Sequence, residues 1–138
     1  MEDDDDLEDI WQDIRAKSIS RKDFRGSRSV STGECSVWMV VNNDPSIPLP
    51  FRQDELPSAN GFEWGYVGAG PAHLSYAILR EHFGRGGKSM KRARLLHRPF
   101  LVECVSRLTH VSWELSAPSI ANIVKTMESQ IEGQQKSP

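Results

Sequence analysis

The chain has 138 residues, of which 38% are hydrophobic, and its 17 basic and 19 acidic residues leave a net charge of −2. This length fits one modest domain with a tail. No apolar run approaches the ~20 residues of a membrane span, so we expect no membrane partner. The charge is segregated, because residues 1–14 hold eight acids and no base, whereas residues 85–98 hold six bases and no acid.

Residues 1–17 form an acidic N-terminal extension. Its apolar residues Leu7, Ile10, Trp11 and Ile14 recur at the i, i+3, i+4 and i+7 positions of one helical stripe. Two interpretations stay open: the stripe packs on the protein's own core, or it docks in a groove of a partner. The acidic partner-binding surface that we select consists of Asp3, Asp4, Asp5, Asp6, Glu8, Asp9, Trp11 and Asp13.

The first half of the chain carries the strand signals. Residues 18–33 are rich in Ser, Arg and Gly and are interpreted as a linker or exposed edge, with a short strand at 19–24. The β-branched run 36–42 predicts a strand, and its nearly continuous apolar character favours a central position. After the turn signal Asn60-Gly61, residues 62–67 are predicted to form another strand.

The second half carries the helix signals. Residues 71–83 predict a mostly buried helix that starts at a proline and ends at a glycine, with a wet strip of His73, Ala77, Arg80 and Glu81. Residues 91–108 predict a helix that is interrupted or restarted at Pro99. A short strand is expected at 111–115. Ser116 is a good N-cap for a last helix.

The order of the elements predicts an α+β fold. We expect an antiparallel or mixed sheet of three to four strands packed against about three helices. The domain is expected to span 18–132, after the extension at 1–17 and before a disordered tail at 133–138. The acidic start differs from a secretory signal, which begins basic and turns apolar. We therefore expect a cytoplasmic protein in which Cys35 and Cys104 are reduced, buried residues rather than a disulfide.

The stretch "GYVGAGPA" raises the question of a phosphate-binding loop. It matches neither G-x-G-x-x-G nor the P-loop pattern, which needs a lysine after its last glycine. A helix N-terminus after Gly70 could bind an anion, but a proline there removes one donor. The favoured interpretation is a sharp turn with close helix packing. The candidate ligand turn consists of Glu63, Gly68, Gly70 and His73, with Glu63 and His73 as a weak acid/base pair.

Residues 85–98 form a basic segment. Its candidate residues for a protein partner or nucleic acid are Arg85, Lys88, Lys91, Arg92, Arg94 and Arg98. They could neutralise several phosphates, although the aromatic residues typical of single-strand binding are absent from the segment. The alternatives are a solvated loop and an intramolecular partner for the acidic extension. No histidine has metal-ligand spacing, so no metal or cofactor is predicted.

The stretch "GFEWGYVGAGPAHLSYAIL" resembles a family of small uncharacterised proteins from bacteria, phages and other mobile elements. The family signature is roughly G-F-E-W-G-Y-x-G-x-G-P-A-x-L-A-x-A-I-L, and this chain departs from it at Ser75. The segments "LLHRPF" and "WELSAPSI" resemble weaker family blocks, so the resemblance covers roughly residues 36–127. It implies one domain and a mobile-element context, and it implies no reaction.

Together these features favour a non-enzymatic binding protein of phage or mobile-element type. Its expected action is inhibition of a host defence or nucleic-acid-handling complex through charged surfaces, as anti-CRISPR proteins act, in the cytoplasm of the host cell. The first alternative is a nucleic-acid-binding module that uses residues 85–98. The second is a small-nucleotide binder or enzyme at the Gly68–Gly70 turn. The sequence does not indicate an oligomeric state.

Overall fold

The computed structural model describes residues 21–56, 61–84 and 86–136, and it describes only the backbone at 134–136. The predictions for the extension at 1–17, for Arg85 and for the turn at Asn60 lie outside these residues. The elements are, in chain order, β1 (Lys22–Arg28), β2 (Cys35–Val41), β3 (Ile47–Pro48), α2 (Ala69–Phe83), α3 (Gly87–Glu103), the 3₁₀ turn η1 (Val105–Arg107), β4 (Ser112–Leu115) and α4 (Ala117–Lys136).

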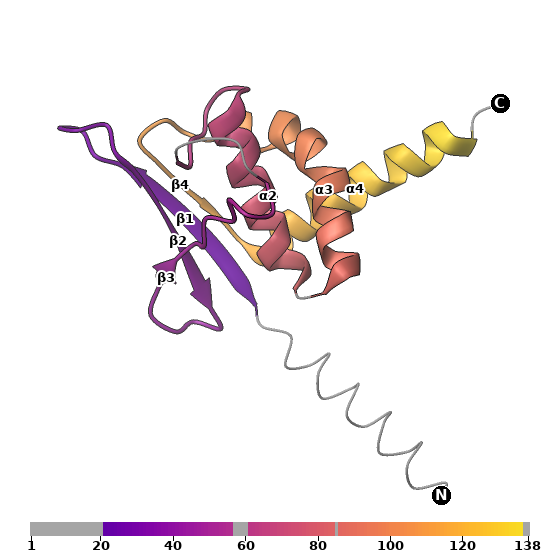
Figure 1. Ribbon diagram of the computed structural model, residues 1–138, viewed down its shortest axis with the longest axis horizontal. Coiled ribbons are helices and arrows are strands. Elements are labelled where there is room, and N and C mark those ends of the chain that lie inside the picture. Colours follow the sequence, from indigo (N-terminus) through magenta and orange to yellow (C-terminus); the bar gives the residue numbers. More distant parts are fainter. Residues whose placement is uncertain (1–20, 57–60, 85, 137–138) are drawn as a thin grey trace, which may run out of the picture.

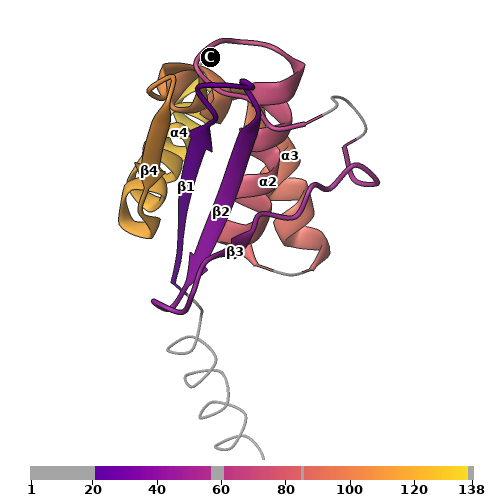
Figure 2. The same ribbon diagram turned by 90° about the vertical axis from the view of Figure 1, so that its left-hand side faces the viewer.

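The four strands form one antiparallel sheet in the order β3-β2-β1-β4. The helices cover only one face of this sheet, as the edge-on view in Figure 1 and the face-on view in Figure 2 show. This arrangement confirms the predicted α+β fold. The predicted strand at 36–42 is confirmed as β2, which lies inside the sheet. None of the described helices is both long and apolar enough to cross a membrane.

The inner face of the sheet carries the core. Side chains alternate along a strand, and Phe24, Val37 and Met39 point to the helices and are buried. Gly26 lies on the same face opposite Trp113, and a Cβ atom at Gly26 would overlap the Trp113 indole. The missing side chain therefore makes room for a tryptophan on the neighbouring strand.

Strand β1 is a central strand that overlaps the short strand expected at 19–24, so the interpretation of residues 22–28 as part of a linker or exposed edge was wrong. Its polar residues either lie on the open face, as Arg25 does, or sit at its ends. Lys22 and Arg28 at these ends pair with buried or half-buried carboxylates of distant segments. The basic composition of the strand therefore reflects ion pairs and an open face. Average polarity alone does not distinguish such a strand from a linker.

The predicted strand at 62–67 was also wrong, because residues 61–68 follow an irregular path. Gly65 has a φ of 88°, a conformation that favours glycine. The Gly65 backbone N–H donates to the Val105 carbonyl oxygen at 3.0 Å. This bond ties the segment to the turn after α3 instead of to a neighbouring strand.

Helix α2 confirms the predicted helix at 71–83 but lacks most of its predicted wet strip. His73 and Ala77 are fully buried and Glu81 is buried, whereas only Arg80 of that strip is half-buried. The reason is that α2 lies between the sheet and α3, as Figure 1 shows. A helix enclosed on both sides needs no solvated face.

Helix α3 runs through Pro99 without a break, so the predicted interruption there was wrong. A proline inside a helix removes one hydrogen bond, but Leu96 and Phe100 on either side are fully buried and hold the helix against the core.

The predictions of a strand at 111–115 and of a last helix are confirmed by β4 and α4. Ser116 caps α4, because the Ser119 N–H donates to its hydroxyl oxygen at 3.3 Å. The helix continues to Lys136, beyond the boundary expected at 132.

Candidate functional site

Glu63 of the family-like motif is held by a strand residue 35 positions earlier. Arg28 donates two hydrogen bonds to its carboxylate, at 2.8 and 3.1 Å, and a third to the His110 carbonyl oxygen at 3.1 Å. The hydrogen bonds from Arg28 lower the pKa of Glu63 and outweigh the opposite effect of burial. A Cβ atom at Gly70 would lie 2.8 Å from the Glu63 Cβ. Gly70 therefore allows the start of α2 to pack against this ion pair.

Trp64 anchors the same motif to the loop before β4. It is only 1% exposed, and its indole N–H lies 3.1 Å from the Thr109 carbonyl oxygen and 2.9 Å from that of His110. Its ring meets Trp113 edge to face at 5.6 Å between centroids. The Arg28 guanidinium lies 4.9 Å from its ring centroid, which adds a cation–π contact. The motif thus joins β1, the loop before β4 and α2.

The four residues of the candidate ligand turn contact different neighbours and do not form one site. Gly68 lies under the Tyr66 ring, and the carboxylate of Glu63 faces Arg28. His73 stacks on Phe51 with 3.9 Å between ring centroids, and burial lowers its pKa despite an opposing hydrogen bond with the Leu56 backbone. Glu63 and His73 thus belong to different clusters. The geometry supports the packing interpretation of the glycines.

A second cluster of ion pairs, which the sequence analysis missed, surrounds Glu81 of α2 and Glu55 of the loop before it. Glu81 binds Lys22 at 2.9 Å and also Arg52. Burial alone would raise the pKa of Glu81, but the hydrogen bonds from Lys22 and Arg52 lower it overall. The remaining contacts of the cluster are made by Glu55, which accepts hydrogen bonds from Tyr76 at 2.6 Å, Arg80 at 2.8 Å and Arg52 at 3.0 Å. Burial and the bond to Glu55 raise the pKa of Tyr76 to about 12.

The structure divides the basic segment into two groups. Arg92 forms two hydrogen bonds with Glu128, at 2.6 and 3.0 Å, and lies over the Phe83 ring. Arg94 donates to the Glu55 backbone carbonyl at 3.1 Å. The second group consists of Lys88, Lys91 and Arg98, and all five of these basic residues are exposed. Within the described chain, no carboxylate forms an ion pair with these three residues.

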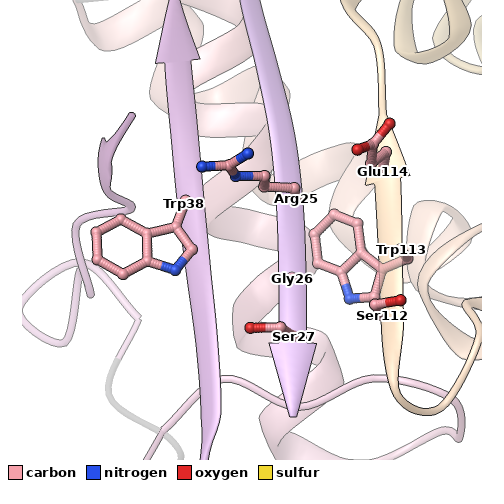
Figure 3. A pocket seen from close by; sticks show the side chains of 7 residues that line it. All are labelled: Arg25, Gly26, Ser27, Trp38, Ser112, Trp113 and Glu114. Atoms are coloured by element: carbon pink, nitrogen blue, oxygen red, sulfur yellow. The ribbon is translucent and has the colours of Figure 1, made fainter. Parts of the chain in front are cut away.

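The outer face of the sheet carries a surface that the sequence analysis also missed. Arg25 is opposite Trp38 on one side and Glu114 on the other. The next outward row joins Ser36, Ser27 and Ser112 in the same register. Short serine side chains beside larger neighbours leave a pocket of about 600 Å³ (Figure 3). The residues that line it are Arg25, Gly26, Ser27, Trp38, Ser112, Trp113 and Glu114.

Trp38 and Arg25 give this pocket its chemical character. Trp38 is 36% exposed although it lies in an interior strand of the sheet. Arg25 leans toward Trp38 in Figure 3 and donates to the Ser46 hydroxyl at 2.8 Å. The sequence did contain one signal for this surface, because strict alternation places Trp38 on the face opposite Val37 and Met39. That signal was overlooked because the nearly continuous apolar run of β2 suggested a strand buried on both faces.

The fold and its open sheet face define a small α+β domain with a candidate binding surface built on rigid strands. A comparison with known protein families matches residues 24–126 to the family of unknown function DUF6166. The chain therefore belongs to this family. No curated protein and no solved structure matches the chain.

Proposed function

We propose that this protein is a non-enzymatic binding protein whose partner is another protein, held on the open face of the sheet. The observation that carries the proposal is the row of Trp38, Arg25 and Glu114 beside the serine pocket. Tryptophan and arginine are the residue types that most often dominate binding energy at protein interfaces. A sheet surface holds them in a fixed geometry, which lowers the entropic cost of binding.

The acidic residue of the motif is held in an ion pair, which supports a binding role over a catalytic one. Glu63 is the residue that the sequence suggested for acid/base chemistry. It forms an ion pair with Arg28 through two hydrogen bonds. That pair stabilises the charged carboxylate and lowers its pKa, whereas a general base working near neutral pH needs a raised one. The ion pair also packs against the start of α2, where Gly70 leaves room for Glu63.

The charges of the open face favour a protein partner over nucleic acid. Glu114 lies directly opposite Arg25. Asp23 on the same face of β1 pairs with Arg21 at 3.2 Å. The face therefore offers no excess of positive charge to a phosphate backbone. Recognition of single-stranded bases on a sheet usually uses two or three stacked aromatic residues. Among the described outward-facing residues of β1, β2 and β4, Trp38 is the one aromatic.

The biological setting of the proposal comes from the resemblance of the central motif to proteins of phages and other mobile elements. In that setting, the partner is a host protein or nucleoprotein complex in the cytoplasm, and the result of binding is inhibition of a defence or nucleic-acid-handling function. The free thiols of Cys35 and Cys104 are compatible with a reducing compartment.

We expect the double variant Trp38→Ala/Arg25→Ala to lose its partner. Loss of an interface hot spot of about 2 kcal/mol or more weakens binding roughly 30-fold. The measurement is quantitative mass spectrometry of proteins captured from a bacterial host lysate, followed by titration of the purified partner. The matched control is Tyr66→Ala/Arg107→Ala, which removes an exposed aromatic and an exposed arginine elsewhere. Equal capture by both variants would contradict the proposed surface.

Nucleic-acid binding through α3 is the second candidate function. It is favoured by Lys88, Lys91 and Arg98, which are exposed and spaced along one helix. If each of the three contacts one phosphate, a plot of the logarithm of the observed binding constant against log[salt] should have a slope of about −2.7 for duplex DNA. Anisotropy titrations at several salt concentrations measure this slope. Lys91→Ala/Arg98→Ala should reduce its magnitude by about 1.8, whereas Arg107→Ala/Lys125→Ala should change it less. A slope near zero in the wild type would exclude this function.

A further inference from the structure

The exposed face of α3 combines positive charge with apolar side chains. Lys88, Lys91, Leu95, Arg98 and Val102 follow one another at intervals of three and four residues, so they lie on one face of the helix. Leu95 is 63% exposed and Val102 is 49% exposed. We call these five residues the α3 stripe. Its three basic residues form no ion pair within the described part of the chain.

The α3 stripe combines basic and apolar side chains, so it matches a ligand that is both acidic and amphipathic. A phosphate backbone would use the charges but would leave Leu95 and Val102 in water. A helix with an apolar stripe flanked by carboxylates uses both, as in helix-in-groove recognition. The segment 1–17 of this chain has that pattern, because Leu7, Ile10, Trp11 and Ile14 share a stripe and eight acids surround them.

Residues 1–17 precede a strand that starts next to the C-terminal end of α2, the helix that leads into α3. Lys22, one residue after the first described residue, contacts Glu81 near the end of α2. Figure 1 shows the start of β1 on the same side of the molecule as the end of α2. The seven residue steps from Ile14 to Arg21 span up to ~23 Å when extended. The stripe itself covers 14 helical steps, or ~21 Å.

We propose that the acidic segment 1–17 docks on the α3 stripe of its own chain, with Trp11 and its apolar neighbours on Leu95 and Val102 and its carboxylates on Lys88, Lys91 and Arg98. Docking covers the basic residues that would otherwise meet nucleic acid or an acidic protein. The short tether raises the effective concentration of the segment to the millimolar range, so a weak intrinsic affinity is sufficient. The attraction between the opposite charges weakens as salt increases.

Hydrogen exchange of the full-length chain, measured by mass spectrometry, tests this docking. At low salt we expect amides of residues 3–14 to exchange about tenfold more slowly in the wild type than in Lys91→Glu/Arg98→Glu. The expected result also includes loss of this protection at high salt. Leu95→Ser/Val102→Ser keeps all charges of the stripe, and it should release the segment as well because the apolar contact is lost.

The matched control is Arg25→Glu/Lys125→Glu, which changes the net charge by the same amount on other exposed surfaces. This control should retain the protection. Equally fast exchange of residues 3–14 in the wild type and in all three variants would overturn the proposal. Equal loss of protection in the control would also overturn it, because the attraction would then depend on net charge alone. Protection that disappears on dilution would assign the segment to a second copy and overturn docking within the chain.

Discussion

Replacing Trp64 with alanine should lower the free energy of unfolding by about 3–5 kcal/mol, the usual cost of removing a buried tryptophan. The change leaves a cavity beside Trp113 and removes the donor that the Thr109 and His110 carbonyl oxygens share. It also removes the ring beneath the Arg28 guanidinium. Small domains are stable by only about 5–15 kcal/mol, so the variant should be partly unfolded at moderate temperature. Urea denaturation followed by circular dichroism measures the change.

Tyr66→Ala is the matched control for Trp64→Ala. Tyr66 belongs to the same motif and is also aromatic, but it is 50% exposed. Its replacement should cost much less, because little apolar surface is returned to water. If both variants lose stability equally, the motif does not act as an anchor through Trp64. The comparison separates the structural role of the motif from any role of its exposed residues.

Replacing Glu81 with alanine should cost about 3–5 kcal/mol, the range expected when one partner of a buried ion pair is removed. Lys22 and Arg52 would keep their charges in a mostly buried site without the carboxylate that they share. The same urea titration measures the loss. Glu103→Ala, on the exposed last turn of α3, is the control and should change stability only slightly. A loss below about 1 kcal/mol for Glu81→Ala would show that the pair is not needed for stability.

The ion-paired glutamates of both clusters predict the direction of the pH dependence. The pKa values of Glu55, Glu63 and Glu81 are all lower in the folded chain than their ordinary value. Their contribution to stability is therefore fully present above ~4.3, the pKa of an unpaired glutamate, and is lost as the pH falls through the lower folded values. Denaturation midpoints of the wild type should fall below pH 4, and the midpoint of Glu81→Ala should fall less. A parallel decrease in both proteins would contradict the assignment to Glu81.

Local patterns predicted most elements of the fold because local forces determine them. The glycine after Phe83 ends α2 with a φ of 87°, and the Ser116 side chain caps α4. The apolar periodicity of α2 and the β-branched run of β2 likewise depend on neighbours in the sequence. The irregular path of residues 61–68 was missed, because its aromatic alternation resembles a strand although its contacts are with distant loops.

The candidate binding surfaces were predicted less well than the fold. The basic segment was found because charge clustering is visible in the sequence. The sequence could not separate Arg92, which binds Glu128, from Lys91 and Arg98, which pair with no carboxylate among the described residues. The sheet pocket was not found, because Arg25, Trp38 and Glu114 come from three strands. Their proximity depends on strand order and register, which no single segment encodes.

The sequence by itself determined the α+β class, the positions of α2, β2, β4 and α4, and the separation of acidic from basic segments. These properties follow from hydrophobic periodicity, capping residues and composition, which act over a few residues. Only the tertiary structure decided which charges are paired and which surfaces stay open. Lys22 meets Glu81 across 59 positions and Arg28 meets Glu63 across 35. Such pairs form because packing of the core fixes the distances between segments, and that packing is a property of the whole chain.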